Sequence, residues 1–303
     1  MKNEPWRRQP GAYALPGTLQ PRFTDVDMWQ HINNVAQIGL HGEVLQQWLR
    51  ATLGGDPWRR AGPALAVCDN ATDFLAEAQY PAPLATGARL LGVDADGLTL
   101  GTALFQNDQC VGLHQTRLGG WEGGRPAPLP TDWLAALQAA QAAQAPLPEG
   151  ATASLAGTPP QPGPAHADAW PWQISIGSRF ADGDGQGHAS DFTLARCAEQ
   201  GRVQFLTRVF GSEDGTRSVG FMVAHVALRW LHRSRAPATW QLGIGVGRVG
   251  ERSLAVRSAL FDGPLCVAES NSVMVVIDHT TRRPAALPEA ARAQLAGYQL
   301  PQT

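Results

Sequence analysis

Residues 22–34 read RFTDVDMWQHINN and residues 179–191 read RFADGDGQGHASD, so one short pattern occurs twice in this chain of 303 residues. At an offset of 157, five of the first ten positions are identical and no gap is needed. The identical pairs are Arg22 and Arg179, Phe23 and Phe180, Asp25 and Asp182, Asp27 and Asp184, and His31 and His188. This agreement indicates two copies of one unit.

The similarity continues beyond this pattern. Residues 103–105 and 259–261 both read ALF at an offset of 156, and RPAPLP at 125–130 matches RPAALP at 283–288 at an offset of 158. Small changes of offset are expected in loops, where insertions cost little. The length also fits two domains of about 150 residues. We therefore expect a first domain at 1–144, a linker rich in Pro, Ala and Gly at 145–168, and a second domain at 169–303.

Composition excludes several classes of function. A net charge of −2 gives no basic surface for nucleic acid. No apolar run approaches the ~20 residues of a membrane span, and the N-terminus lacks the apolar segment of a signal peptide. The four cysteines have no CxxC spacing, which favours reduced thiols and a cytoplasmic protein.

Each copy is expected to contain a short strand, one long helix and then several strands. A strand is expected at about 17–25, followed by a helix that begins at Asn33 or Asn34, either of which can cap it, and ends near residue 52 before Gly54. The apolar face of this helix is expected to be Val35, Ile38, Gly42, Leu45 and Leu49. Strands are expected at 64–68, 71–78, 88–94, 98–106 and 110–118, with hairpin turns at Asp96-Gly97 and Asn107-Asp108. A helix follows at 133–144. The second copy repeats this order with a helix at about 192–210 and strands from 219 to 277, and the predicted class is α+β, a sheet wrapped round a helix.

The corner between the first strand and the helix carries a family resemblance. The run from Asp25 to Asn34, followed by Glu43 on the helix, resembles the corner of hotdog-fold thioesterases, most of all the 4-hydroxybenzoyl-CoA thioesterase-like branch. The resemblance implies two tandem hotdog domains, which would pair within the chain as hotdog subunits usually pair in a dimer. It also implies an acyl-CoA thioesterase that needs no cofactor and no metal, and whose tandem chains can associate into a homodimer.

Thioester hydrolysis requires the types of residue that this corner contains. A carboxylate must activate water or attack the carbonyl, and hydrogen-bond donors must hold the developing oxyanion. We expect Asp27 to be that carboxylate, His31 and Asn33 to position the carbonyl or the water, and the amides at the helix start to bind the oxyanion. Glu43 lies about three turns further along and can reach a site only across the domain pair.

The second copy is not equivalent to the first. It keeps Asp184 and His188, but Ser190-Asp191 replaces the two asparagines. Its helix acid, Glu199, lies eleven residues after the histidine, whereas Glu43 lies twelve after. One position turns a helix by ~100°, so the two acids should face different sides. We expect the first copy to be the working site and Asp184, His188 and Glu199 to form a second site or a wall of the first.

A structural interpretation competes at each of these positions. An Asp-x-Asp turn before a helix often only caps and closes the chain, and duplication alone would preserve such a corner. Asp25 and Asp182 are expected to be structural, because alternation along a strand points them away from Asp27 and Asp184, and Arg22 and Arg179 are their expected partners.

Other chemistries have weaker support in the sequence. The sequence lacks the GxSxG pattern of many serine hydrolases, and no motif in it has the spacing of a set of metal ligands. The sequence thus predicts hydrolysis of an acyl-CoA to a carboxylic acid and CoA. An acyl-ACP thioesterase is the alternative within enzymes, and an acyl-binding protein without catalysis is the alternative from another class.

Overall fold

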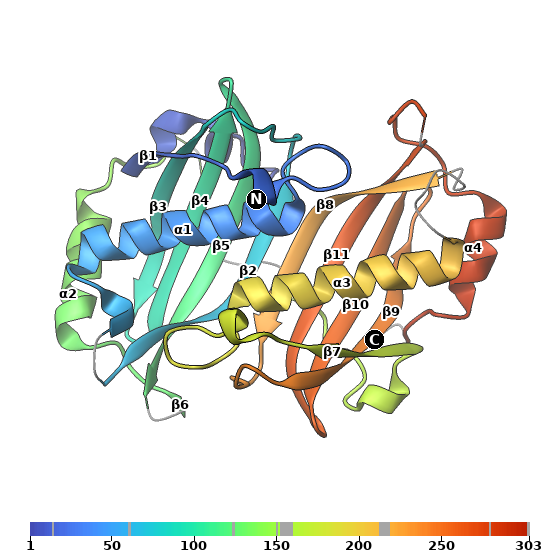
Figure 1. Ribbon diagram of the computed structural model, residues 1–303. Coiled ribbons are helices and arrows are strands. Elements are labelled where there is room, and N and C mark those ends of the chain that lie inside the picture. The colour runs from blue at the N-terminus through green and yellow to red at the C-terminus, as the bar shows by residue number, and fades with distance from the viewer. Residues whose placement is uncertain are drawn as a thin grey trace. The chain divides into compact units, whose positions relative to one another are not determined.

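The computed structural model divides the chain into two compact units, Met1–Pro159 (unit 1) and Pro160–Thr303 (unit 2) (Figure 1). Part of the predicted linker, residue 150 and residues 152–159, lies outside the described residues. The structure describes residues 1–13, 15–59, 62–122, 125–149, 151, 160–211, 219–278 and 280–301.

Unit 1 contains one long helix, a shorter second helix and a sheet whose strands are all paired antiparallel. The sheet order is β1-β3-β4-β5-β2, with β6 added to β5. The helix α1 packs on β3, β4 and β5, and α2 packs on β3. The elements are η1 (Pro5–Arg8), η2 (Pro10–Ala12), β1 (Leu15–Leu19), η3 (Phe23–Asp25), α1 (Asn34–Leu53), η4 (Pro57–Arg59), β2 (Ala64–Phe74), β3 (Leu84–Asp94), β4 (Gly97–Gln106), β5 (Gln109–Glu122), β6 (Arg125–Pro126) and α2 (Thr131–Ala143).

Unit 2 repeats this plan. Its sheet order is β7-β9-β10-β11-β8, again antiparallel, and α3 packs on β7, β8, β9 and β10. The α+β class expected from the sequence is therefore confirmed. The elements are η5 (Ala167–Ala169), β7 (Trp172–Gly177), η6 (Phe180–Asp182), α3 (Asp191–Phe210), β8 (Val219–Trp230), β9 (Thr239–Val249), β10 (Ser253–Asp262), β11 (Leu265–Asp278) and α4 (Glu289–Ala296).

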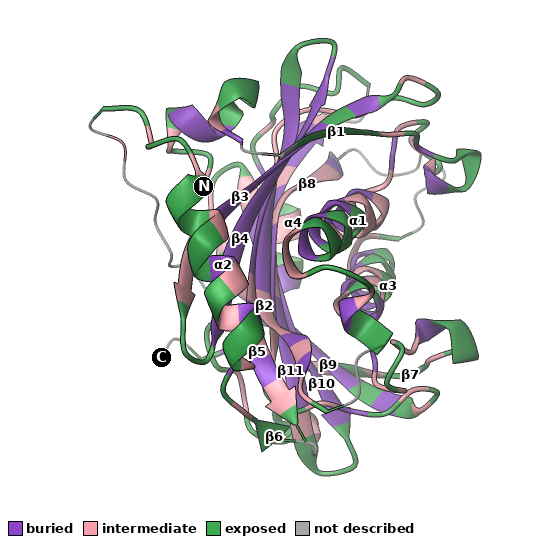
Figure 2. Ribbon diagram, turned by 90° about the vertical axis from the view of Figure 1, so that its left-hand side faces the viewer, coloured by how far each residue is buried: buried purple, intermediate pink, exposed green. Residues whose placement is uncertain are grey.

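Helix α1 has the boundaries that its sequence predicts. The side chain of Asn33 accepts hydrogen bonds from the first-turn amides, and Gly54 ends the helix at a φ of 75°. Four of the five predicted face residues are buried, and Gly42 is half-buried. They meet a sheet in which every residue of β4 is buried (Figure 2). Burying this face against the sheet supplies most of the stability of such a helix, because helical propensity alone is weak.

Two strand predictions are wrong in detail. The first strand ends at Leu19 rather than at residue 25, because the carboxylate of Asp25 accepts the amide of Arg22 and closes a 3₁₀ turn. Alternation along a strand is therefore not what separates Asp25 from Asp27. The two strands predicted at 64–68 and 71–78 are one strand, β2, which carries a bulge between Val67 and Asp69 and ends at residue 74.

No helix in the part of the chain that the structure describes is long and apolar enough to cross a membrane.

Candidate active site

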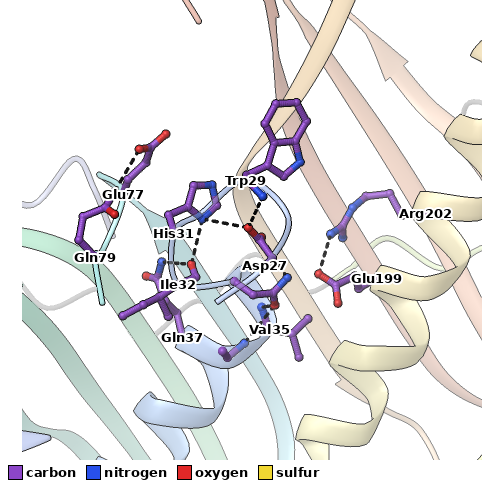
Figure 3. Close-up of polar contacts among 12 residues, drawn as sticks. Asp27, Trp29, His31, Ile32, Val35, Gln37, Glu77, Gln79, Glu199 and Arg202 are labelled. Atoms are coloured by element: carbon purple, nitrogen blue, oxygen red, sulfur yellow. Dashed lines mark hydrogen bonds and ion pairs between the residues drawn. The ribbon is translucent and has the colours of Figure 1, made fainter. Parts of the chain in front are cut away.

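In unit 1 the predicted residues meet in a closed turn between η3 and α1 (Figure 3). The amide of Asp27 donates to the carbonyl of His31 over 3.1 Å, and the amide of Gln30 donates to the carbonyl of Asp27 over 3.0 Å. Gln30 adopts a φ of 66°, the left-handed conformation that this tight reversal requires. The reversal brings the side chains of Asp27 and His31 together.

Asn33 links this turn to the helix. Its Oδ1 accepts the amides of Val35 and Ala36, at 2.7 Å and 3.2 Å. Its Nδ2 lies 3.4 Å from Oδ2 of Asp27, within hydrogen-bond range. One amide side chain therefore caps α1 and donates to the candidate carboxylate, which an ionised aspartate, having no donor, could not do.

The Asp27 carboxylate is held by hydrogen-bond donors alone. Besides Asn33, it accepts the amide of Trp29 over 2.9 Å, and Nδ1 of His31 lies 3.7 Å from its Oδ1. The side chains of Asp27 and His31 keep 20% and 19% of their surface exposed. Among the described residues, no arginine or lysine pairs with Asp27. The carboxylate is thus partly open to solvent and not neutralised.

The start of α1 offers fewer free amides than the sequence suggested. The amides of Val35 and Ala36 are taken by the Asn33 side chain, and that of Gln37 is taken by the Asn33 carbonyl. The amide of Asn34 remains, with no acceptor in the described part of the chain. If helix-start amides bind an oxyanion here, Asn34 is the one that can donate.

Unit 2 keeps the backbone of the turn. The amide of Asp184 donates to the carbonyl of His188 over 2.6 Å, and that of Gly187 donates to the carbonyl of Asp184 over 3.0 Å. Gly187 has a φ of 76°, matching Gln30. The Asp184 side chain accepts the amides of Gln186 and His188 at 2.8 Å and 3.0 Å. The turn itself is therefore conserved between the two units as a structural device.

The surroundings of the unit 2 carboxylate differ sharply. Arg233 forms an ion pair with Oδ2 of Asp184. Ser190 caps α3 by accepting the amide of Thr193 over 3.1 Å, but it has no amide group to donate to Asp184. Burial, followed by the charge of Arg233, lowers the pKa of His188. Asp184 is thus a paired carboxylate beside a histidine that resists protonation.

Sequence reasoning missed Arg233, although a signal was present. The amide of Ile32 donates to the carbonyl of Ala78, and at the equivalent place the amide of Ala189 donates to that of Ser234. This match makes Glu77 of unit 1 the residue equivalent to Arg233 of unit 2. The same offset of 156 is visible in the sequence, so the charge reversal could have been read from it.

The two helix acids occupy different positions. Helices α1 and α3 have the same length, with caps at Asn33 and Ser190, so Glu43 is equivalent to Gln200 rather than to Glu199. Glu43 is exposed and accepts a hydrogen bond from Gln47 over 2.9 Å. Glu199 is half-buried, with Arg202 3.9 Å away (Figure 3). The two acids therefore lie at non-equivalent helix positions, and a catalytic role for either stays a prediction.

The expected partners of the structural acids are also in place. Arg22 pairs with Asp25 at 2.9 Å and Arg179 with Asp182 at 3.6 Å, and both acids are buried. Arg196 of α3 forms a second ion pair with Asp182. Within the described ranges, no group of three or more His, Cys, Asp and Glu side chains is arranged to hold a metal ion.

Comparison with known proteins places the fold. No family model and no curated protein sequence matches the chain. Among solved structures, a 12:0-ACP thioesterase from Umbellularia californica has a TM-score of 0.69 and 10% identity, covering 86% of this chain and 94% of the other. An acyl-ACP thioesterase from Bacteroides thetaiotaomicron has a TM-score of 0.60 and 11% identity, covering 86% and 97%. The fold of this chain is therefore that of hotdog thioesterases that carry two hotdog domains in one chain, as the sequence predicted.

Proposed function

We propose that this chain hydrolyses an acyl thioester, with Asp27 as the catalytic carboxylate. The observation that carries the proposal is the environment of Asp27: hydrogen-bonded by Trp29 and Asn33, next to His31, partly exposed and without a cationic partner among the described residues. A carboxylate in this state can take a proton from water or attack a carbonyl carbon. The fold is shared with proteins named as thioesterases, which supports this reaction over others.

The residues around Asp27 have distinct parts in the proposed reaction. Asp27 takes a proton from water, and the oxygen of that water adds to the thioester carbonyl carbon. The negative charge moves to the carbonyl oxygen, towards the amide of Asn34. When the carbonyl reforms, the carbon–sulfur bond breaks, and the thiolate leaves and takes up the proton held by Asp27, which restores the carboxylate. Asn33 and His31 hold the carboxylate and the reacting groups in place.

The substrate that we favour is an acyl-CoA. Acyl-ACP is a second candidate, because both neighbours quoted above are named as ACP thioesterases. An exposed arginine and an exposed phenylalanine, Arg22 and Phe23, lie beside the Asp27 turn and suit the acidic, partly apolar surface of a carrier protein. The two carriers predict different rates for the same acyl group, so a direct comparison decides between them.

The test is thiol release from matched acyl-CoA and acyl-ACP substrates, short to long and aromatic, by wild type and Asp27→Asn. We expect turnover of at least one carrier's esters and its loss in the variant. Acyl-CoA that binds tightly but is not turned over by wild type, with no release from ACP, would instead identify an acyl-binding protein. A single turnover in ¹⁸O water then tests the nucleophilic role of Asp27: label in the Asp27 carboxylate identifies a mixed anhydride that water opens at the Asp27 carbonyl. Label in the product acid alone is the result expected of a general base, and failure to trap an acyl-enzyme then excludes an anhydride opened at the acyl carbon.

A further inference from the structure

The interior of unit 1 holds a polar group that the proposed reaction does not use. Gln37 and His41 follow Asn33 along one face of α1 at intervals of four residues, and both are buried, at 4% and 0% exposure. They face the sheet, where Gly112 of β5 lies opposite them. This group, Gln37, His41 and Gly112, is here termed the interior polar site.

The His41 ring is fixed from two sides. Its Nδ1 lies 2.8 Å from the hydroxyl of Thr102, and the ring stacks on that of His114, with centroids 5.0 Å apart at 15°. The ring of His114 is held in turn by the hydroxyls of Thr72 and Thr116, at 2.7 Å and 2.6 Å. Burial holds the pKa of His41 well below its usual value and lowers that of His114 to about 3, so both rings are neutral at ordinary pH.

Two atoms of the interior polar site have no hydrogen-bond partner among the described residues. They are Nε2 of His41 and Oε1 of Gln37, both fully shielded from solvent. A Cβ placed on Gly112 would lie 3.1 Å from the first atom and 3.2 Å from the second, so both atoms lie against the same face of Gly112. Buried polar atoms are almost always hydrogen-bonded, so two unpartnered atoms that both lie against Gly112 are candidates to bind one further polar group.

Unit 2 lacks every element of this site. The helix offset of 157 places Leu194 and Ala198 at the positions of Gln37 and His41, and the strand offset of 156 places Ala268 at that of Gly112. The polar pair and the glycine that it packs against are thus replaced together. Packing of the helix on the sheet needs neither, because unit 2 achieves it with apolar residues.

We propose that the interior polar site binds a hydroxyl group on the acyl chain of the substrate, a refinement that rests on the proposed thioesterase function. The amide nitrogen of Gln37 is directed at the carbonyl of Ile32, 3.5 Å away, so its oxygen is the atom that needs a donor. A hydroxyl donates to that oxygen and accepts from the Nε2–H of His41, whose Nδ1 then accepts the Thr102 hydroxyl. A ketone cannot donate and would leave the oxygen of Gln37 unpaired.

The site is adjacent to the Asp27 corner. Nδ1 of His31 lies 3.2 Å from the carbonyl oxygen of Ile32, and the side-chain amide of Gln37 donates to the same oxygen (Figure 3). From Asn33 the helix rises about 6 Å to Gln37 and about 12 Å to His41. An acyl chain whose thioester lies at Asp27 would therefore bring a hydroxyl to this site from the middle of the chain, not from the carbon next to the carbonyl.

The test uses acyl-CoAs of one chain length that carry a hydroxyl, a ketone or only hydrogen at successive carbons. The measured quantity is kcat/KM for each substituted ester divided by that for the plain ester. At one mid-chain carbon we expect a hydroxyl preference of about 10–100-fold and no preference for the ketone. Gln37→Leu introduces the residue of unit 2, and Gly112→Ala adds a methyl group in close contact with both unpartnered atoms. Each should bring the hydroxyl ratio close to one. Gln46→Leu makes the same change at an exposed position of α1 and should keep the wild-type ratio.

The outcomes separate this inference from the proposed function. Turnover with no hydroxyl preference at any carbon overturns the inference, and so does an equal loss of preference in Gln46→Leu. The two unpartnered atoms would then bind no more than an ordered water. If no thioester is cleaved, the proposed function fails, and calorimetric binding of the same esters decides the inference by itself. Tighter binding of one hydroxyl ester that is lost in Gln37→Leu and Gly112→Ala supports it, and equal binding of all esters overturns it.

Discussion

The Asp27 turn of unit 1 and the Asp184 turn of unit 2 share a backbone and differ in their electrostatics. Both close through the same two main-chain hydrogen bonds, and both place a left-handed residue before the histidine. In unit 1 the carboxylate meets an amide side chain, whereas in unit 2 it meets a guanidinium. A repeated motif therefore indicates that the turn matters for folding, and the groups around the carboxylate are the basis on which we propose unit 1 as the working copy.

The largest test of this comparison is the pair Asp27→Asn and Asp184→Asn. Removing a general base typically lowers the rate by ~10²–10⁴-fold, and we expect that loss in kcat for Asp27→Asn. Asp184 is paired with Arg233, so Asp184→Asn should change kcat by less than about threefold. Thiol release under saturating substrate measures both. A collapse with Asp184→Asn alone, in a variant that still melts as a folded protein, would place the chemistry in unit 2.

The second test concerns His41 and His114, the two buried histidines of unit 1, which have no buried counterpart among the described histidines of unit 2. His41 and His114 have pKa values below the unfolded value of about 6.5, so the unfolded chain binds more protons as the pH falls. Above pH 6.5 the two histidines are neutral in both the folded and the unfolded chain, so they cost no stability. Below pH 6.5 the unfolded chain takes up protons that the folded protein does not, so the free energy of unfolding falls as the pH drops towards 3. At pH 5.5 the two together should cost about 3 kcal/mol relative to pH 7.5.

The matched variant for this test carries the residues of unit 2, His41→Ala with His114→Ser. The variant loses packing at every pH, so the informative quantity is the difference between pH 7.5 and pH 5.5. Urea unfolding should show that this difference is about 3 kcal/mol smaller in the variant than in wild type. An equal difference in both proteins would mean that the two rings do not titrate as their burial requires.

The third test exchanges the charge that distinguishes the two turns. Glu77→Arg introduces the residue that unit 2 carries at Arg233, and an arginine beside a carboxylate lowers its pKa by about 1–3 units. A less basic Asp27 should hydrolyse thioesters about tenfold more slowly. Glu149→Arg makes the same change at an exposed position of unit 1 and is the control for net charge. Equal rates in the two variants would show that the ion pair of unit 2 is not what separates the copies.

These comparisons also show how far the sequence predicts the molecule. The bounds of α1 could be predicted because local residues set them, Asn33 by its side-chain cap and Gly54 by its backbone. The end of the first strand could not, because the hydrogen bond from the Arg22 amide to Asp25 replaces strand pairing with a turn. Likewise, the bulge in β2 joined two predicted strands into one.

In the candidate site, too, some contacts could be predicted from the sequence and others could not. Asp27, His31 and Asn33 lie within six residues, so the turn that joins them was predictable from their spacing. Arg233 lies 49 residues from Asp184, and Thr102 lies 61 residues from His41, so only the packing of loops and helix on the sheet brings them together. Contacts of that kind depend on tertiary packing, which no local pattern specifies.

The smallest effects are expected at the two helix caps, where stability and activity can be separated. Ser190→Ala should cost about 1 kcal/mol of unfolding free energy, because the amide of Thr193 loses its acceptor, and it should leave kcat/KM unchanged. Asn33→Ser keeps an oxygen for the cap but removes the Nδ2 donor that faces Asp27. We expect that variant to unfold within about 0.5 kcal/mol of wild type, since serine and asparagine cap about equally, and to lose several-fold in kcat/KM. Urea unfolding and thioester turnover on the same preparations measure both quantities. If Asn33→Ser retained full activity, the amide would be only a cap, and the difference between the two turns would rest on Arg233 alone.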